Sequence, residues 1–536
     1  MLQRLTSSLT RQALVVVALA LVVYWPLLGH AGLTDSEGHR AIPGWRMLAS
    51  GEFLVTHLFE HPYLRKPPGM PWAVAASSAL LGETEFAARA VSALASTFAA
   101  LLALVFAARW FGRAHALWAG AAFVLMPLTW APARAAEIEA LNHVFTLAAA
   151  ALVLDLFLRP AGARLARASL LALAALGLLL AKGPASLPVI AGAVASGWIV
   201  TRSPRALAVI APALLASALV AGSLAWAIAQ RVLGQDPVTQ SPAEFLWSLA
   251  RVPAIAAFGP LALLSALPAA LALAFPFGPD ARAEAETSDD AREVTRAARA
   301  LALAVLLSLG AYTVLGVSNP RYAMPALMLA PIGMAYLRWG AAGGGMLPLR
   351  ARLARWAMLD PARGVGLPML ALLLIASGVF VFLTDAQKVR SSGREVGQRL
   401  AQDLKPAQGE RRVMLWADGL IEARPEILWY AQREAQRLGY ELSVRWSPGW
   451  RALPPGGAAL ALRTDDRGNE LGVLTRLGPN NAMSEPEPEI EFREWRFTLV
   501  RPKPAASDAP ATDEPAPGPD PNPAPDQPTD GPRNPS

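Results

Sequence analysis

The sequence predicts an all-α polytopic membrane domain followed by a small C-terminal α/β domain. Its apolar residues gather in blocks of about twenty, the length that a helix needs to cross roughly 30 Å of hydrocarbon. The blocks lack the alternation of barrel strands, and a membrane core accepts only helices or closed barrels. Charged residues make up 17% of the 536-residue chain, whereas soluble domains have about 25%.

Composition narrows the functional classes. The formal charge is +7, but most basic residues flank apolar blocks, so topology explains them better than nucleic-acid binding does. The chain has no cysteine, which excludes a disulfide framework and thiolate metal sites. The first block, 12–30, is long, and His30-Ala31-Gly32 is a poor cleavage site, so we expect an uncleaved span rather than a signal peptide.

Hydropathy predicts about eleven transmembrane helices, and up to thirteen if short apolar segments are counted. A further apolar segment, 70–81, is too short to span and is expected to re-enter the membrane or lie at its surface. The expected spans are 12–30, 87–109, 115–131, 138–158, 167–181, 184–200, 205–229, 252–276, 299–318, 321–337 and 366–384.

Basic residues set the expected orientation, because cytoplasmic loops are enriched in Lys and Arg. A cytoplasmic N-terminus gives an alternation that holds along the whole chain, as in a bacterial inner-membrane protein. The cytoplasmic loops then carry Arg113, Arg159, Arg164, Arg167, Arg202, Arg205, Arg338, Arg350, Arg352, Arg355 and Arg363. The periplasmic side receives 31–86, 132–137, the connection at Lys182, 230–251, Ser318–Arg321 and everything after 385.

The C-terminal part changes character. Strands are expected at Arg412–Ala417, Tyr440–Trp446, 458–463 and 494–500, with a helix over Pro425–Leu438. From about 501, Pro, Asp, Ala and Asn dominate, and such a segment buries too little apolar surface to order itself. The expected domains are 1–384 in the membrane, 385–500 as a periplasmic α/β domain, and 501–536 as a disordered tail.

Two charged motifs lie in the first periplasmic loop. Asp35 and Glu37 stand two apart beside His39 and Arg40, a pattern that suits acid–base chemistry but also suits a solvated surface. The segment Tyr63–Gly69 is a proline-stiffened turn that presents Arg65 and Lys66 together. These two cations are either a snorkelling interfacial pair or a phosphate clamp.

A third motif begins the span at 138–158. Glu139 and His143 share a helix face with Asn142, and charge this close to a span is costly unless it faces a polar cavity. Arg134 and Glu137 precede them, and favourable interaction with the helix dipole is the alternative role for Glu137.

Further candidates lie at other expected periplasmic turns. Lys182 is a lone cation between two apolar blocks, and Arg321 and Tyr322 follow Asn319-Pro320. Arg231, Asp236 and Arg251 around the loop 230–251 are weaker candidates.

The chain has six histidines, and several of them lie in or beside the first loop. With Asp35 and Glu37, these histidines form a candidate divalent-metal site. Their spacing matches no standard metal site, so the sequence does not decide whether a metal binds. These histidines are His30, His39, His57 and His61.

These motifs, in this order, resemble the GT-C superfamily of integral-membrane glycosyltransferases, on the branch of the aminoarabinose (lipid A) transferases and protein O-mannosyltransferases. The resemblance is specific from about 30 to 190, weaker to 340 and absent from the C-terminal domain. It rests on the acidic first loop, Met47–Gly51, Leu64–Pro68, Gly82–Arg89, Glu139, Lys182–Pro184 and Arg321-Tyr322.

The resemblance implies a GT-C fold and sugar transfer from a polyprenyl-phosphate donor to a lipid, glycan or protein on the extracytoplasmic face. It implies that an acidic residue of the first loop acts as the base on the acceptor. In family members this residue commonly belongs to an Asp-Glu pair. Aligning Met47–Gly51 without a gap sets Ser36-Glu37 against that pair, whereas a one-residue gap restores Asp35, so both acids remain candidates.

A mechanistic hypothesis assigns the other roles. Glu139 is expected to position the acceptor or share its proton, and Lys66, Arg65, Lys182 and Arg321 are expected to bind the donor phosphate. The acceptor side is expected to be shaped by His39, Arg40, Tyr63, Arg134, Glu137, His143 and Tyr322.

Two rival hypotheses remain at this level. A flippase for lipid-linked sugars needs similar cations, but it favours internal repeats and deep charges, which the sequence does not show clearly. A non-catalytic assembly protein leaves the acidic and basic loop motifs unexplained.

Overall fold

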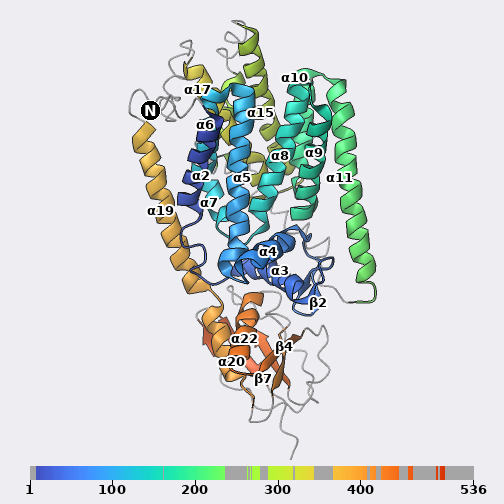
Figure 1. Cartoon of the computed structure of the whole chain (residues 1–536), viewed down its shortest axis with the longest axis vertical. Helices are drawn as coiled ribbons and strands as arrows, with labels where there is room; N and C mark the ends of the chain where they lie inside the picture. Colours follow the sequence, from blue (N-terminus) through green and yellow to red (C-terminus); the bar gives the residue numbers. More distant parts are fainter. Residues whose placement is uncertain are drawn as a thin grey trace, which may run out of the picture.

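The computed structural model describes residues 8–160, 162–235, 262–263, 266, 269–277, 288–317, 320–342, 366–406, 411–417, 424–445, 457–462, 490–492 and 495–500. A bundle of long helices occupies one part of the molecule and a small α/β part lies beyond its end, with two shorter helices, α3 and α4, between them (Figure 1). We call the end of the bundle that carries α3 and α4 the loop end.

The expected apolar blocks form the bundle. Its helices are α2 (Leu9–Tyr24), α5 (Glu85–Phe111), α6 (Arg113–Leu125), α7 (Pro127–Ala133), α8 (Ile138–Leu158), α9 (Arg164–Lys182), α10 (Leu187–Thr201), α11 (Pro204–Arg231), α15 (Asp289–Val314), α17 (Ala330–Ala342) and α19 (Gly366–Ser391). Among the described residues, six helical segments are long and apolar enough to cross a membrane, or seven if the pair α6 and α7, bent by 61°, is one span. The prediction of a largely helical, multi-pass membrane protein is confirmed.

Prolines account for the spans that differ from expectation. The first helix ends at Tyr24 instead of reaching residue 30, because Pro26 cannot donate the next helical hydrogen bond. The expected span 321–337 is broken into η5 (Pro320–Tyr322), α16 (Met324–Leu327) and α17, with Pro325 and Pro331 at helix starts. The expected span 252–276 lies largely outside the described residues, and its described pieces include the turns η3 (Ala269–Leu273) and η4 (Phe275–Phe277).

The first loop is folded onto the loop end. It contains η1 (Asp35–Glu37), α3 (Gly38–Ser50), a short hairpin of β1 (His57–Leu58) and β2 (His61–Pro62), and α4 (Gly69–Leu81). Gly51 ends α3 with φ of 72°, a left-handed conformation that suits glycine, and its N–H donates to the Met47 carbonyl at 2.9 Å. The apolar segment expected at 70–81 is α4, which lies across the bundle end (Figure 1).

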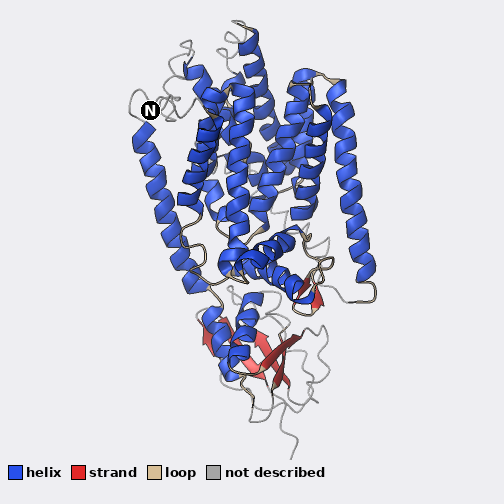
Figure 2. Ribbon diagram, viewed as in Figure 1, coloured by secondary structure: helices blue, strands red, loops and turns tan. Residues whose placement is uncertain are grey.

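The α/β part contains a five-stranded sheet in the order β4-β3-β5-β7-β6. Figure 2 shows its strands grouped beyond the loop end. Strand β3 pairs in parallel with β4 and β5, and β7 pairs antiparallel with β5 and β6. The elements are β3 (Arg412–Trp416), β4 (Glu441–Arg445), β5 (Gly457–Leu462), β6 (Ile490–Phe492), β7 (Trp495–Val500), α20 (Arg394–Asp403) and α22 (Pro425–Arg437). Residues 501–536, expected to be disordered, lie outside the described residues.

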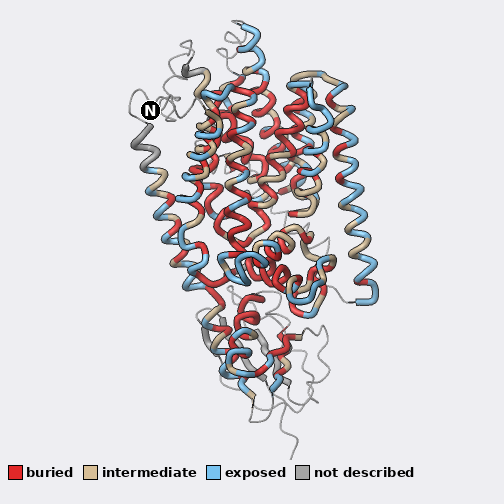
Figure 3. Tube along the Cα trace, viewed as in Figure 1, coloured by how far each residue is buried: buried red, intermediate tan, exposed pale blue. Residues whose placement is uncertain are grey.

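The α/β part packs directly on the first loop. Trp45 of α3 stacks on Trp429 of α22 with ring centroids 4.3 Å apart. Glu85 accepts hydrogen bonds from the Tyr430 hydroxyl at 2.7 Å and from Arg394 at 2.6 Å. Buried residues run from the loop into α22 (Figure 3). The sequence predicted strands at the positions of β3, β4, β5 and β7 and a helix at that of α22, but it predicted neither α20 and β6 nor the contact with the loop.

Candidate functional site

Charged side chains from three separate segments meet at the loop end. Lys182, at the end of α9, donates to Glu139 Oε1 at 3.0 Å, and Arg321 Nε donates to the same oxygen at 2.7 Å. Arg321 Nη2 also donates to Glu137 Oε2 at 3.0 Å, and the Lys182 ammonium lies 5.1 Å from the centre of the Tyr322 ring. We call Glu137, Glu139, Lys182 and Arg321 the carboxylate–cation cluster. All four were predicted from the sequence as site residues.

Two further cations belong to the same electrostatic environment. Burial, with the nearby charges of Arg40 and Lys182, lowers the pKa of Lys66 to about 8. Among the described residues, the Lys66 ammonium makes no hydrogen bond. Among the described side chains, four cations therefore surround two carboxylates, and these cations are Lys66, Arg40, Lys182 and Arg321. The arrangement holds a positive surplus suited to an anionic ligand.

Glu137 stands at the N-cap of α8 and is partly buried, with its side chain 13% exposed. Its Oε1 accepts a hydrogen bond from the Ser36 hydroxyl, which joins the cluster to the acidic first-loop motif. Burial and the neighbouring Glu139 raise the pKa of Glu137 above its usual range. The Glu137 carboxyl group therefore holds a proton more readily than an exposed glutamate does.

The remaining predicted residues lie on two sides of the cluster. His143, one turn along α8, is buried, and its Nε2 has no partner among the described residues. Arg40 Nη1 donates to the Tyr63 hydroxyl at 3.3 Å, and the Tyr63 and His39 rings lie 5.7 Å apart. Arg65 lies next to Lys66 in the turn before α4.

Arg134 is separate from the cluster. Its Nη1 donates to the Tyr24 carbonyl at 2.9 Å, and the side chain faces a cavity beside α19. The sequence grouped Arg134 with Glu137 and Glu139, whereas its side chain lines a cavity that those two residues do not line.

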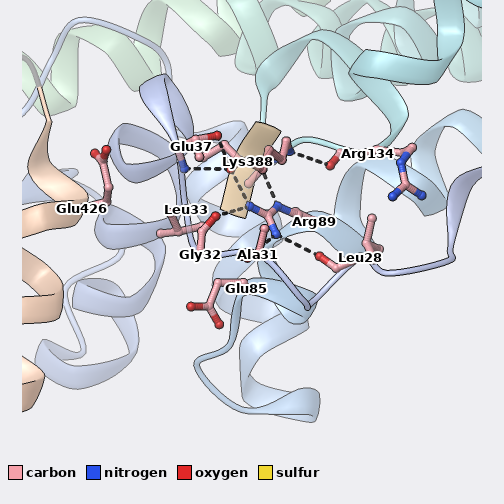
Figure 4. A network of polar contacts seen from close by, with 12 residues as sticks. Leu28, Ala31, Gly32, Leu33, Glu37, Glu85, Arg89, Arg134, Lys388 and Glu426 are labelled. Carbon is pink, nitrogen blue, oxygen red and sulfur yellow. Dashed lines mark hydrogen bonds and ion pairs between the residues drawn. The ribbon is translucent and has the colours of Figure 1, made fainter. Parts of the chain in front are cut away.

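Glu37 is buried and its carboxylate accepts six hydrogen bonds (Figure 4). Arg89 of α5 binds both oxygens at 2.8 and 2.7 Å, Lys388 of α19 donates to Oε1 at 3.0 Å, and the Ala136 amide donates at 2.9 Å. The Thr34 amide and hydroxyl complete the set at 3.0 and 3.2 Å.

The protonation state of Glu37 follows from these partners. Burial raises the pKa of Glu37, but Arg89, Lys388 and the Ala136 amide outweigh burial and hold the pKa well below its usual range. A carboxylate has about four lone-pair sites, so Glu37 has no free site for an acceptor proton. Glu37 is therefore poorly suited to act as a base, and the side chain of Asp35, the other candidate, lies outside the described residues.

The sequence did not single out the partners of Glu37 individually. Arg89 lies in the segment that carries the resemblance. An arginine near the start of an apolar helix is equally typical of a side chain that snorkels to the membrane interface. Lys388 lies 351 positions from Glu37, and no local pattern links residues so far apart. Of the weaker candidates, Asp236 and Arg251 lie outside the described residues, as does Asn319.

The candidate metal site receives no support from the described residues, which contain no group of three or more His, Asp or Glu side chains arranged to hold an ion. His30 Nδ1 instead pairs with Asp385 at 2.8 Å, and His57 Nδ1 lies 3.0 Å from the Val55 carbonyl.

Comparison by sequence gives a short match. No protein-family model matches the chain. The undecaprenyl phosphate-alpha-4-amino-4-deoxy-L-arabinose arabinosyl transferase 2 of Pseudomonas fluorescens is 33% identical over 106 residues, which are 19% of this chain and 18% of that relative. The match thus spans less than a fifth of either protein.

Comparison by structure extends over nearly the whole chain. ArnT from Cupriavidus metallidurans in the apo state has 19% sequence identity and a TM-score of 0.62, covering 92% of this chain and 98% of that one. The same protein bound to undecaprenyl phosphate gives 19% identity and a TM-score of 0.61, covering 91% and 97%. The chain therefore shares the fold of ArnT over nearly its whole length.

Proposed function

We propose that the protein is a membrane glycosyltransferase that transfers a sugar from a polyprenyl-phosphate donor to an extracytoplasmic acceptor. The acceptor is a lipid A-like lipid, an envelope glycan or a protein, and the sugar is a hexose or a pentose. The observation that carries the proposal is the surplus of cations around the carboxylate–cation cluster. The fold shared with ArnT, one structure of which holds undecaprenyl phosphate, supports it.

The cations suit a phosphate leaving group. Lys66 donates to no group among the described residues. Lys182 and Arg321 bind two neighbouring carboxylates, whose negative charge does not balance that of the cations. A polyprenyl phosphate carries the missing negative charge, and lysine and arginine both bind phosphate strongly. We assign Lys66, Lys182 and Arg321, with Arg65, to the donor phosphate, where they stabilise the charge that develops as the phosphate departs.

The transfer step follows from these assignments. Asp35 takes the proton of an acceptor hydroxyl, and the acceptor oxygen forms a bond to the anomeric carbon of the donor sugar. The bond from that carbon to the phosphate oxygen breaks, and its electron pair leaves with the polyprenyl phosphate. Glu139 and Glu137 position the acceptor, with His39, Arg40, Tyr63, His143 and Tyr322 shaping the surrounding surface, while Glu37 holds the loop that carries Asp35.

The same proposal fixes the topology. The N-terminus lies in the cytoplasm, about eleven helices cross the bacterial inner membrane, and the loop end faces the periplasm. Residues 1–384 form the transferase domain, 385–500 the α/β domain and 501–536 the tail. The contacts of Trp429 and Tyr430 with the first loop suit a role for the α/β domain in shielding the site or selecting the acceptor.

Replacing Lys66 with Ala is expected to weaken donor binding about 10- to 100-fold, since a hydrogen bond to a charged group contributes about 1.5–3 kcal/mol. Undecaprenyl phosphate is a suitable probe, with binding followed by intrinsic fluorescence of the purified protein. Lys405→Ala, which removes an exposed lysine after α20, is the matched control. Unchanged affinity in Lys66→Ala would remove the phosphate-clamp assignment.

Donor binding is also expected to fall as pH rises through about 8, the pKa of Lys66 in the unliganded protein. The protonated ammonium binds phosphate, so affinity is highest below this pH. Above it, affinity decreases by up to tenfold per pH unit until the pKa of the complex is reached. Titration with undecaprenyl phosphate from about pH 6.5 to about pH 9.5, roughly 1.5 units either side of 8, checks this expectation. Lys66→Arg is the control, because its side chain stays charged throughout this range. A wild-type profile as flat as that of the arginine variant would contradict it.

The activity itself is tested in cells. A deletion strain is compared with its parent by mass spectrometry of envelope lipids, glycans and glycoproteins. Loss of one sugar modification, restored by the wild-type gene but not by Asp35→Asn, supports the transferase. An unchanged envelope in the deletion strain argues against it.

A further inference from the structure

A charged cavity lies beside α19, and no residue of the carboxylate–cation cluster lines it. Its volume is about 120 Å³, and its lining comes from the segment after α2, the start of α5, the end of α7, and α19. The charged residues in the lining are Arg89, Arg134, Asp385 and Lys388. A buried water needs roughly 10–15 Å³ of such space, so the cavity has room for a phosphate-sized group.

The charges around this cavity do not balance. In the part of the chain that the structure describes, three cations, Arg89, Arg134 and Lys388, accompany two carboxylates, Glu37 and Asp385, which leaves a surplus of one positive charge. The neighbouring His30 bonds to Asp385 at 2.8 Å. A partly buried charge without a counterion is costly, so an anion in the cavity would be stabilised.

The donors of Arg89 are fully used within the protein. Its five N–H groups bond to the two Glu37 oxygens and to the carbonyls of Leu28, Ala31 and Gly32 (Figure 4). A guanidinium has five N–H donors in all. Arg89 therefore forms part of the frame and is not available to a ligand.

Arg134 and Lys388 retain unused donors. Among the described residues, Arg134 makes one hydrogen bond, from Nη1 to the Tyr24 carbonyl. Lys388 uses two of its three ammonium N–H groups, on Glu37 and on the Arg134 carbonyl. Burial lowers the pKa of Arg134 to about 10, as expected for a cation that lacks a sufficient counterion.

The cavity adjoins the lipid-facing side of the bundle. Leu27 and Phe380 contribute apolar lining, and α19 runs along the outside of the bundle (Figure 1). The outward side chains Ile375, Val379 and Phe382 of α19 are exposed at 64%, 52% and 67%, as suits contact with acyl chains. A ligand that places an anionic group in the cavity and an apolar chain along this surface has the chemistry of a phospholipid.

We propose that this cavity binds the phosphate of an anionic membrane phospholipid, with Arg134 and Lys388 donating to the phosphate and an acyl chain lying along α19. The bound lipid would fasten α19 to the bundle and complete the charge balance beside Glu37. The proposal concerns a site separate from the donor site and does not depend on the transferase activity.

The test is lipid binding measured by native mass spectrometry on the purified full-length protein. The probes are phosphatidylglycerol, a diacylglycerol with the same acyl chains, and inorganic phosphate. Arg134→Gln removes the charge, Arg134→Lys retains it, and Arg231→Gln removes an exposed arginine at the end of α11 as control. We expect phosphatidylglycerol to bind at least tenfold more weakly to Arg134→Gln, and unchanged to the other two variants.

Three outcomes would overturn the proposal. Equal binding of phosphatidylglycerol to Arg134→Gln and wild type would remove the site. Equal binding of diacylglycerol would show an apolar groove without phosphate recognition, and inorganic phosphate that competes as well as the lipid would show a free-anion site. If Arg134→Gln fails to fold, Thr384→Glu serves instead, since the Thr384 hydroxyl bonds within its own helix and a carboxylate there should repel the lipid.

Discussion

Replacing Asp35 with Asn is expected to slow sugar transfer about 10²- to 10⁴-fold, the usual contribution of a general base. Asparagine keeps the size of the side chain and its place in η1, but it cannot take a proton from the acceptor. The affinity for undecaprenyl phosphate should stay near the wild-type value, because the cations that we assign to the phosphate are Lys66, Lys182 and Arg321.

The structural reason for choosing Asp35 is the state of its neighbour. Six donors bind the Glu37 carboxylate, and they hold its pKa well below the usual range. A base needs a free lone pair and a pKa closer to the working pH. Glu37→Gln should therefore act mainly through loss of structure, with less folded protein at every pH.

The comparison of single variants separates the two acids. The transfer rate of each purified variant is divided by the fraction that binds undecaprenyl phosphate, so that unfolded protein does not count. Full transfer by Asp35→Asn, with loss confined to Glu37→Gln, would reverse the assignment. Full transfer by the double variant would place the base elsewhere, with Glu137 as the next candidate because its pKa is raised.

Much of the site could be predicted from the sequence because its motifs are local. Glu139, Lys182 and Arg321 each stand at the edge of an apolar block, where a charge is expensive unless it has a partner. Their mutual pairing could not be predicted, since it joins positions 43 and 182 residues apart. For the same reason Arg134 was grouped with its sequence neighbours, whereas the structure turns it toward α19.

The fold was predictable where hydropathy alone decides it. Blocks such as 87–109 and 138–158 correspond closely to α5 and α8, because long apolar runs have one stable arrangement in a membrane. The segment 321–337 was less predictable, since Pro325 and Pro331 compete with its apolar character and break it. The docking of α22 on the first loop depends on contacts such as Trp45 with Trp429, which no local pattern encodes.

Arg89→Met is expected to cause the largest loss of stability, about 3–5 kcal/mol, the usual cost of removing one member of a buried ion pair. Arg89 is 1% exposed and Glu37 is 2% exposed. The substitution leaves Glu37 with Lys388 as its single cation and leaves three carbonyls without their donor. The first loop should therefore lose its fixed position against α5.

The measurement is the half-life of ligand binding during heating in detergent, because membrane proteins often unfold irreversibly. Arg292→Met is the control, since Arg292 pairs with Asp289 at an exposed site, with side chains 58% and 93% exposed, where such a pair contributes about 0–1 kcal/mol. The double variant Glu37→Gln with Arg89→Met should recover part of the loss, because it no longer buries an under-paired carboxylate. A half-life for Arg89→Met equal to that of Arg292→Met would mean that the Glu37–Arg89 pair does not hold the loop.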